Sequence, residues 1–350
     1  MMSPAKSPAV DLLAVPALRA AAALRLGDAL GPARTIALST HINADGDGCG
    51  SEAAIAGLLV AAGHAVRIVN PTAWPSTFDF LRDSGASFVD ADDKKALAGI
   101  DALIVLDISD VKRLGVLADQ VRALAVPKLV IDHHVPSDEP PGQIALIDTA
   151  ACATGELVFD LAMTMGWRIT LPVATALYTA LLTDTGGFRF SNTSPRCHAI
   201  AGQLLAVGID PEEMYRRVYA SVPLGRLQLL RDALETLTVD PDRALAWISV
   251  PAGAMERYAL RSEDLDGIVE HPRSIAGTRL ALFFRDLGHG KVKVSFRSTG
   301  DVDVNRFARE FGGGGHAKAA GALVAGTLDE VRTRVVDAAR AFLENGVPAA

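Results

Sequence analysis

The chain has 350 residues, of which 49% are hydrophobic and 21% charged, as is typical of globular proteins long enough for two domains. Its formal net charge of −7 argues against broad binding of long nucleic acid, which normally needs a basic surface. Three cysteines are too few, and odd in number, for a disulfide framework. The apolar stretch over 11–31 is interrupted by Asp11, Arg19, Arg25 and Asp28. We therefore expect an amphipathic helix there, not a signal peptide or membrane span, and a cytoplasmic protein.

Apolar runs alternate with helix-like segments through the first half of the chain. Strand-like runs lie at residues 34–40, 65–70, 102–109 and 128–134, and helical patterns lie at 50–63 and 114–124. Strands that alternate with helices predict a parallel sheet joined by right-handed crossovers. The first half of the chain is therefore expected to form an α/β domain.

The second half of the chain has a different pattern. It is mostly helical from about residue 152 to residue 236, and we place the connection between two domains there. Strand-like runs follow at 244–250, 279–286, 291–298 and 320–326, with helical patterns at 303–312 and 328–346. We predict an α/β fold with a parallel-sheet domain over 1–210, a helical connection over 211–236 and a smaller mixed α+β domain over 237–350.

Six potential metal ligands follow the apolar runs, at points where strands or a helix should end. They are His41, Asp45, Asp47, Asp107, His133 and Asp184. Because ligands gather outside the carboxyl ends of the strands in an open α/β sheet, we expect these side chains to converge. Four carboxylates and two imidazoles in one crevice would repel one another and lose hydration without cations. The pattern therefore predicts a two-metal hydrolytic site.

Each of these motifs also has a simpler explanation. The first Asp-rich segment could be a polar turn, with Ser51 as the cap of the following helix. Asp107 could form a turn, the histidines at 133–134 could be structural, and Asp184 could end a helix. An EF-hand fits poorly because the ligand alternation stops after Asp47, and a P-loop lacks its Gly-Lys-Ser/Thr. Only the order and spacing of all the motifs together favour the metal site.

The glycine run at 312–315 could be a flexible linker. Structured segments flank it, however, and glycines between a helix and a strand let backbone N–H groups approach an anion closely. Arg297, at the end of the strand-like run 291–298, could bind a phosphate there. We therefore predict a ligand-binding loop and not a linker.

A series of short motifs gives the chain a resemblance to a known family. HINADGDG, LDISD, DHH and DTGGF occur in this order, and VSFRSTGDVDVNRFAREFGGGGHAKAAG follows them. With these segments the chain resembles the DHH phosphoesterase superfamily with its DHH-associated C-terminal domain. The combination of these two domains and the length of the chain are similar to those of the nanoRNase/pAp-phosphatase branch. That branch trims very short RNAs and dephosphorylates 3′-phosphoadenosine 5′-phosphate (pAp). The resemblance covers nearly the whole chain from about residue 20, and implies a DHH catalytic domain joined to a substrate-binding domain.

The resemblance implies a role for each motif residue. One metal ion would be held by His41, Asp45 and Asp107, and a second by Asp47, Asp107, His133 and Asp184, with Asp107 bridging. His134 would face the scissile phosphate, and Asp132 would support the histidines. The nucleotide would be held in the second domain by Arg297, Asn305, Gly312, Gly313, Gly314, Gly315 and His316. No ligand position is missing, which argues against an inactive relative.

The expected cofactors are two divalent ions, and mixed carboxylate–imidazole ligation favours Mn²⁺ over Mg²⁺. The main hypothesis is a Mn²⁺-dependent phosphohydrolase that acts on short oligoribonucleotides, linear dinucleotides and pAp. We expect neither a long duplex nor a membrane as partner, and a homodimer is compatible with the sequence.

Other functions remain open at this stage. A cyclic dinucleotide phosphodiesterase would share the same site, and the sequence does not separate the two. A polyphosphatase or pyrophosphatase would share the first domain, but the glycine-rich second domain argues for a nucleotide ligand. A nucleotide-binding regulator with a residual metal site is disfavoured by the complete set of ligands. A processive single-strand nuclease would be expected to carry basic grooves and extra binding modules.

Overall fold

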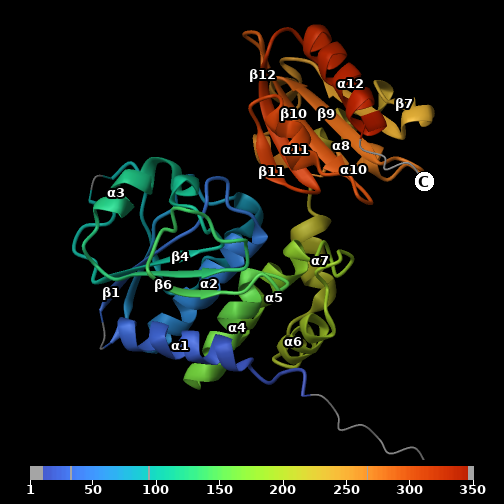
Figure 1. The fold of residues 1–350 in the computed structure, drawn as a ribbon. Coiled ribbons are helices and arrows are strands. Elements are labelled where there is room, and N and C mark those ends of the chain that lie inside the picture. Colours follow the sequence, from blue (N-terminus) through green and yellow to red (C-terminus); the bar gives the residue numbers. More distant parts are fainter. Residues whose placement is uncertain (1–10, 32–33, 94, 266, 346–350) are drawn as a thin grey trace, which may run out of the picture. The chain divides into compact units, whose positions relative to one another are not determined.

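The chain forms two compact units that divide between Ser221 and Val222, and each is described by itself (Figure 1). The computed structural model describes residues 11–31, 34–93, 95–265 and 267–345. In the part that it describes, no helix combines the length and the apolar character needed to cross a lipid bilayer.

The first unit is built on a six-stranded parallel sheet. Its strands are β1 (Thr35–Ser39), β2 (Ala65–Ile68), β3 (Ser87–Phe88), β4 (Ala102–Leu106), β5 (Lys128–Asp132) and β6 (Ile144–Ile147), in the order β3-β2-β1-β4-β5-β6. The direction of the strand order reverses between β1 and β4, and such a switch point opens a crevice at the carboxyl ends of the strands. The predicted parallel sheet is confirmed, although the sequence did not indicate β3 or β6.

Helices cover both faces of this sheet. They are α1 (Ala17–Leu30), α2 (Gly46–Ala61), α3 (Ala118–Ala123), α4 (Thr154–Met165), α5 (Leu171–Asp184), α6 (Pro195–Leu205) and α7 (Pro211–Tyr219), with 3₁₀ helices η1 (Ser76–Leu81) and η2 (Val111–Leu117). Ile36 and Leu38 of β1 belong to the core that includes α1, α2, α4 and α5. Ala37, between them, belongs to the core under η2 and α3. Because both faces are buried, the central strands are mostly apolar and appear as apolar runs in the sequence.

Two helices differ from the sequence prediction. Helix α2 begins at Gly46, earlier than expected, because the Asp45 carboxylate accepts hydrogen bonds from two backbone N–H groups of its first turn. Ser51 therefore lies inside the helix and does not cap it. The helix predicted over 114–124 is a 3₁₀ helix followed by the short α3, because Gly115 has a φ of 51° that interrupts the turn.

The second unit is the predicted mixed α+β domain, and its sheet has six strands, two more than the sequence indicated. Its strands are β7 (Thr238–Asp240), β8 (Leu245–Val250), β9 (Leu280–Asp286), β10 (Lys291–Ser298), β11 (Gly314–His316) and β12 (Ala319–Ala325), in the order β11-β12-β10-β9-β8-β7. The pair β8–β9 is parallel and the other pairs are antiparallel. The helices are α8 (Leu224–Glu235), α9 (Ala254–Arg257), α10 (Glu270–Arg273), α11 (Val304–Arg309) and α12 (Leu328–Asn345), with 3₁₀ helices η3 (Pro241–Arg243) and η4 (Ser262–Leu265).

The segment predicted as a helical connection over 211–236 is divided between the two units. Met214 of α7 is buried in the core of the first unit. Leu229 of α8 is instead buried with Ile248 of β8 in the second unit. The division therefore falls in the short stretch between the two helices, because each helix buries its apolar side against a different sheet.

Candidate metal centre

The six predicted metal ligands come together at the carboxyl edge of the parallel sheet. His41 follows β1, Asp107 follows β4, and His133 follows β5, while Asp45 and Asp47 lie at the start of α2 and Asp184 ends α5. Helices α2, α4 and α5 pack beside one another against this sheet (Figure 1). The start of α2 approaches the end of α5 so closely that a Cβ atom at Gly46 would lie 2.3 Å from Thr183. This close approach brings Asp47 and Asp184 to the same place.

The donor atoms form two groups. In the first, Nε2 of His41 lies 3.8 Å from Oδ1 of Asp45 and 3.4 Å from Oδ2 of Asp107. In the second, Nε2 of His133 lies 3.7 Å from an oxygen of Asp47 and 3.7 Å from one of Asp184.

Asp107 joins the two groups, because its Oδ2 faces His41 and its Oδ1 lies 3.7 Å from Nε2 of His133. The ligand atoms of His41, Asp45 and Asp107 all lie within 4.8 Å of one another, as do those of Asp47, His133 and Asp184. The chain therefore presents two clusters of potential ligands that share one carboxylate.

The carboxylates of the cluster would be stabilised by added positive charge. Burial, reinforced by repulsion from Asp107, holds the pKa of Asp47 well above its usual value. Burial also raises the pKa of Asp184 to about 6, against the attraction of His133. Burial alone would lower the pKa of His41, but its contacts with Asp107 and Asp45 raise it to about 10. Divalent cations would relieve the repulsion that otherwise drives these groups to take up protons.

The donor atoms of this cluster are better placed to coordinate a cation than to form hydrogen bonds with one another. Nε2 of His133 is buried and has no hydrogen-bond partner among the described residues. Its other ring nitrogen, Nδ1, lies 3.3 Å from the carbonyl oxygen of Ala151, and this contact turns Nε2 toward the carboxylates. A backbone carbonyl on one ring nitrogen, with the other left to coordinate, is the usual arrangement of a metal-bound histidine.

Asp132 and His134 form a hydrogen-bonded pair at the cluster, and a ring nitrogen of His134 forms a third group of potential ligands with Asp107 and His133. Oδ1 of Asp132, a fully buried residue, accepts hydrogen bonds from the backbone N–H of His134 at 3.1 Å and from its Nδ1 at 2.7 Å. The resemblance implied that Asp132 supports both histidines. In the described contacts it supports His134 alone, because the ring of His133 is oriented by Ala151.

Backbone strain marks two loops of the cluster. Asp107 has a φ of 63° and Asn43, between His41 and Asp45, has a φ of 55°. Residues other than glycine rarely adopt this left-handed region, although Asp and Asn tolerate it better than most. Such strain persists only where the surroundings enforce it, and it is common at functional sites.

Two supporting features were not apparent in the sequence. Thr154 and Gly155, at the start of α4, donate backbone hydrogen bonds to Asp47 at 2.6 and 3.0 Å. The hydroxyl of Thr154 also donates to Oδ1 of Asp107 at 2.9 Å. A run of small residues before a helix, Ala-Cys-Ala-Thr-Gly, was the only signal, and it does not show which carboxylate the helix will meet.

The second missed feature is a buried polar group behind His41. The fully buried Glu52 accepts a hydrogen bond from Asn70 at 2.7 Å, and Asn70 accepts one from the N–H of Thr40. Burial raises the pKa of Glu52 to about 8, although the bond from Asn70 acts in the opposite direction. This chain of contacts fixes the end of β1 just before His41.

The predicted substrate residues lie together in the second unit. The register of the sheet places Ala319 of β12 opposite Arg297 of β10 on one side and His316 of β11 on the other. The Asn305 side chain accepts a hydrogen bond from the N–H of Gly315 at 3.1 Å. Arg297 lies 3.4 Å from Glu270 and donates to the carbonyl of Phe296. The side chain of His316 lies outside the described part of the structure.

The glycine run at 312–315 is part of the folded second unit and not a flexible linker. Gly314 and Gly315 belong to β11, which pairs with β12. A Cβ atom at Gly313 would lie 2.1 Å from the carbonyl oxygen of Gly321, and one at Gly315 would lie 2.4 Å from that of Ala319. Gly312 has a φ of 71°, which suits glycine. The linker explanation is therefore wrong for these residues, whereas ligand binding stays a prediction.

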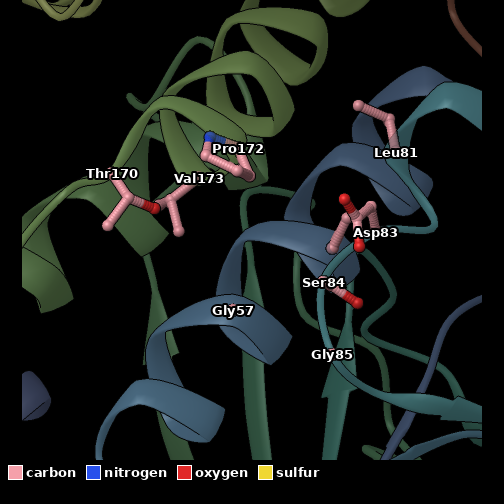
Figure 2. Close-up of a pocket in the computed structure, with 9 residues that line it drawn as sticks. Gly57, Leu81, Asp83, Ser84, Gly85, Thr170, Pro172 and Val173 are labelled. Carbon is pink, nitrogen blue, oxygen red and sulfur yellow. The ribbon is translucent and has the colours of Figure 1, made fainter.

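Two of the cavities among the described residues lie outside the cluster of donors. One, of about 230 Å³, is lined by Gly57 of α2, by Asp83 and Ser84, and by Thr170 and Pro172 near the start of α5 (Figure 2). The metal donors are not among its lining residues. The other, of about 450 Å³, includes Asn70 and Thr72 in its wall. Thr72 accepts a hydrogen bond from the N–H of Asn43, so this second cavity adjoins the loop that carries His41.

A parallel sheet whose carboxyl edge gathers two groups of carboxylate and imidazole donors defines a hydrolase of the phosphoesterase class. Residues 35–182 match the DHH family, N-terminal domain, and residues 252–345 match the DHHA1 domain. The chain belongs to the DHH family, and the predicted resemblance is confirmed.

Relatives along most of the chain support this assignment. The chain is 32% identical over 309 residues to the bifunctional oligoribonuclease and PAP phosphatase NrnA of Thermus thermophilus, covering 87% of this chain and 89% of the relative. It is 26% identical over 293 residues to NrnA of Bacillus subtilis, covering 83% and 89%.

Solved structures show the same architecture. An exopolyphosphatase-related protein from Bacteroides fragilis superposes with a TM-score of 0.85 at 30% identity, covering 93% of this chain and 96% of that one. RecJ in complex with Mn²⁺ from Thermus thermophilus has a TM-score of 0.51 at 17% identity, covering 97% and 56%. This second similarity reflects the fold alone.

Proposed function

We propose that the chain is a Mn²⁺-dependent phosphohydrolase that cleaves short oligoribonucleotides and linear dinucleotides to nucleoside monophosphates, with pAp as a further substrate. The observation that carries the proposal is the sharing of Asp107 between the two donor groups, which is the arrangement that a pair of cations needs. The names of the NrnA relatives support the choice of substrates.

The proposed ligands divide as the donor groups do. His41, Asp45 and Asp107 would hold one ion, and Asp47, Asp107, His133 and Asp184 would hold the other. When bound, the two ions would activate water at neutral pH and neutralise charge on the phosphoryl group. Imidazole nitrogens among the ligands favour Mn²⁺, because Mg²⁺ prefers oxygen ligands and retains its waters.

His134 is proposed to contact the scissile phosphate. Burial alone would lower the pKa of His134, but the bond from its Nδ1 to Asp132 raises it. Asp132 thus holds a proton on Nδ1 and favours the positively charged ring, which suits contact with an anionic phosphate. The pair also fixes the orientation of the ring before substrate arrives.

The second unit is proposed to bind the nucleotide portion of the substrate. Arg297 supplies a guanidinium suited to a phosphate, and the glycine run with Asn305 presents backbone groups without side-chain obstruction. A site that binds a nucleotide remote from the cleaved bond would favour short substrates, because it would contact the end of the RNA strand.

The test is a product analysis with purified protein and Mn²⁺. A dinucleotide, a five-residue RNA, a long RNA, pAp and a cyclic dinucleotide are compared, with Asp107→Asn as the inactive control. We expect monophosphates from the dinucleotide and the five-residue RNA, phosphate release from pAp, and little turnover of long RNA. Preferred cleavage of the cyclic dinucleotide would replace this proposal with a second-messenger phosphodiesterase. Binding without Mn²⁺-stimulated turnover of any substrate would contradict an enzymatic role.

A further inference from the structure

The start of helix α4 makes an unusual set of contacts with the metal centre. Ala153, at its N-cap position, has no side-chain oxygen to accept the first N–H groups of the helix. The carboxylate of Asp47, a residue of α2, performs this role. It accepts the N–H groups of Thr154 and Gly155 at 2.6 and 3.0 Å. Asp47 is therefore both a proposed metal ligand and the cap of a different helix.

The hydroxyl of Thr154 reaches the carboxylate that joins the two groups of donors. It donates to Oδ1 of Asp107 at 2.9 Å, the oxygen that lies 3.7 Å from Nε2 of His133. Thr154 is fully buried, so water does not compete for this bond. One residue thus contacts two carboxylates that come from different elements.

Packing and buried ion pairs keep the start of α4 in place. A Cβ atom at Gly155 would lie 2.5 Å from that of Ala180, so α4 and α5 are in close contact there. In the same first turn, Glu156 accepts the N–H of Cys152 and pairs with Arg19 at 2.6 Å and Arg196 at 3.2 Å.

Asp160 extends this anchorage along α4. It pairs with Arg19 at 2.9 Å and also with Arg196. Because Arg19 comes from α1 and Arg196 from α6, the first two turns of α4 are tied to two other helices. These contacts therefore hold the start of α4 in a fixed position, as a residue that orients other side chains requires.

We propose that Thr154 is a positioning residue of the metal centre, which fixes the bridging carboxylate Asp107 through its hydroxyl and Asp47 through its N–H. The inference rests on the proposed divalent-metal site. It predicts that the hydroxyl contributes to metal affinity, because an oriented carboxylate loses less freedom when it coordinates an ion. Thr154 acts through these two carboxylates and is not itself a proposed metal ligand.

The experiment compares Thr154→Val, which removes the hydroxyl and keeps the shape, with Thr154→Ser, which keeps the hydroxyl. Thr164→Val is the matched control, because Thr164 lies on the same helix and its hydroxyl bonds only to the backbone carbonyl of Asp160 among the described contacts. Mn²⁺ binding to each metal-free protein is measured by calorimetry, with the Mn²⁺ concentration needed for half-maximal hydrolysis of a dinucleotide as a second readout.

We expect Thr154→Val to weaken Mn²⁺ binding by about 10- to 100-fold, the usual effect of losing a partner that orients a ligand. Excess Mn²⁺ should restore most of its turnover, Thr154→Ser should bind Mn²⁺ as the parent does, and Thr164→Val should not differ. If Thr154→Val fails to fold by circular dichroism, Thr154→Ala removes the hydroxyl without risk of a clash and takes its place.

The outcomes separate this inference from the proposed function. If the parent protein binds no Mn²⁺, the metal site itself is wrong. If the parent binds two ions and Thr154→Val binds them with unchanged affinity, the positioning role is wrong while the metal site stands. Equal weakening in Thr154→Ser and Thr154→Val would also overturn it, because the effect would then not follow the hydroxyl.

Discussion

Nε2 of His133 lies 3.7 Å from Oδ2 of Asp184, so the end of strand β5 and the end of helix α5 meet at one point. Neither residue is near the other in sequence, and each has an ordinary structural explanation by itself. Their proximity, together with the shared carboxylate of Asp107, makes the cluster a candidate for two cations.

Asp107→Asn should abolish activity, because this residue is shared by both donor groups. We expect more than ~100-fold loss of turnover, the scale for disrupting a ligand or its support, with both ions depleted. Metal content is measured by mass spectrometry alongside Mn²⁺-dependent hydrolysis. Asp119→Asn is the control, since Asp119 is 95% exposed and bonds to Arg122 on the surface. Two tightly bound ions and normal turnover in Asp107→Asn would contradict the bridging role.

Asp132→Ala and His133→Ala should differ in their response to metal. His133 is a proposed direct ligand, so its loss should reduce metal content and should not be corrected by added Mn²⁺. Asp132 contacts His134 and not the ligand group, so its loss should lower turnover while both ions remain bound. Mn²⁺ titrations of activity, followed by metal analysis, distinguish the two. Identical titrations would show that the division of roles within the motif is wrong.

Arg297→Ala should impair a dinucleotide substrate and spare a small artificial phosphodiester that has no second nucleotide. One lost charged contact to a phosphate should reduce kcat/KM for the dinucleotide roughly 10- to 150-fold. Arg332→Ala is the control, because Arg332 lies on α12 of the same unit and pairs with Asp329. Unchanged kcat/KM for the dinucleotide in Arg297→Ala would remove this residue from the substrate site.

Arg19→Leu should destabilise the first unit strongly. Arg19 is 5% exposed and pairs with Glu156 and Asp160, which would keep only Arg196, and removing one partner of a buried ion pair costs up to about 3–5 kcal/mol. Urea denaturation of the metal-free protein measures the change in the free energy of unfolding. Arg122→Leu provides the comparison, since Arg122 forms its ion pairs on the surface and its loss should have little effect. Equal stability of the two variants would mean that the buried network does not hold α1 to α4.

Glu52→Gln should change how stability depends on pH. The pKa of Glu52 is raised to about 8 by burial, so the folded protein keeps this carboxyl protonated while the unfolded chain ionises near its usual value of 4.5. The contribution of the Glu52 carboxyl to the free energy of unfolding is therefore fully present below pH 4.5 and is lost as pH rises through about 8. Metal-free Glu52→Gln should thus have a higher Tm than the parent at pH 8 and a similar Tm at pH 4.5. The same difference in Tm at both values would contradict a protonated Glu52.

Much of the fold follows from local patterns in the sequence. The apolar runs of β1, β4 and β5 indicated parallel strands because both of their faces are buried, and helices α4 to α8 were evident from their apolar periodicity. Strands β3 and β6 were not indicated, and β3, with two residues, carries too little pattern to be recognised. The start of α2 depended on Asp45 acting as its cap, and a residue that can both cap and coordinate has the same sequence signature in either role.

The identity of the candidate ligands was determined by the sequence, because their order after successive strands implies one edge of one sheet. Their grouping was decided only by the tertiary structure, since it depends on how close α2 comes to α5 and on which oxygen of Asp107 faces which histidine. The contacts of Thr154 with Asp47 and Asp107 could not be predicted either, because the run of small residues at 151–155 does not show which carboxylates the helix will meet. A hydrogen bond between residues far apart in the chain depends on the packing of whole helices, and no local pattern of residue types encodes that distance.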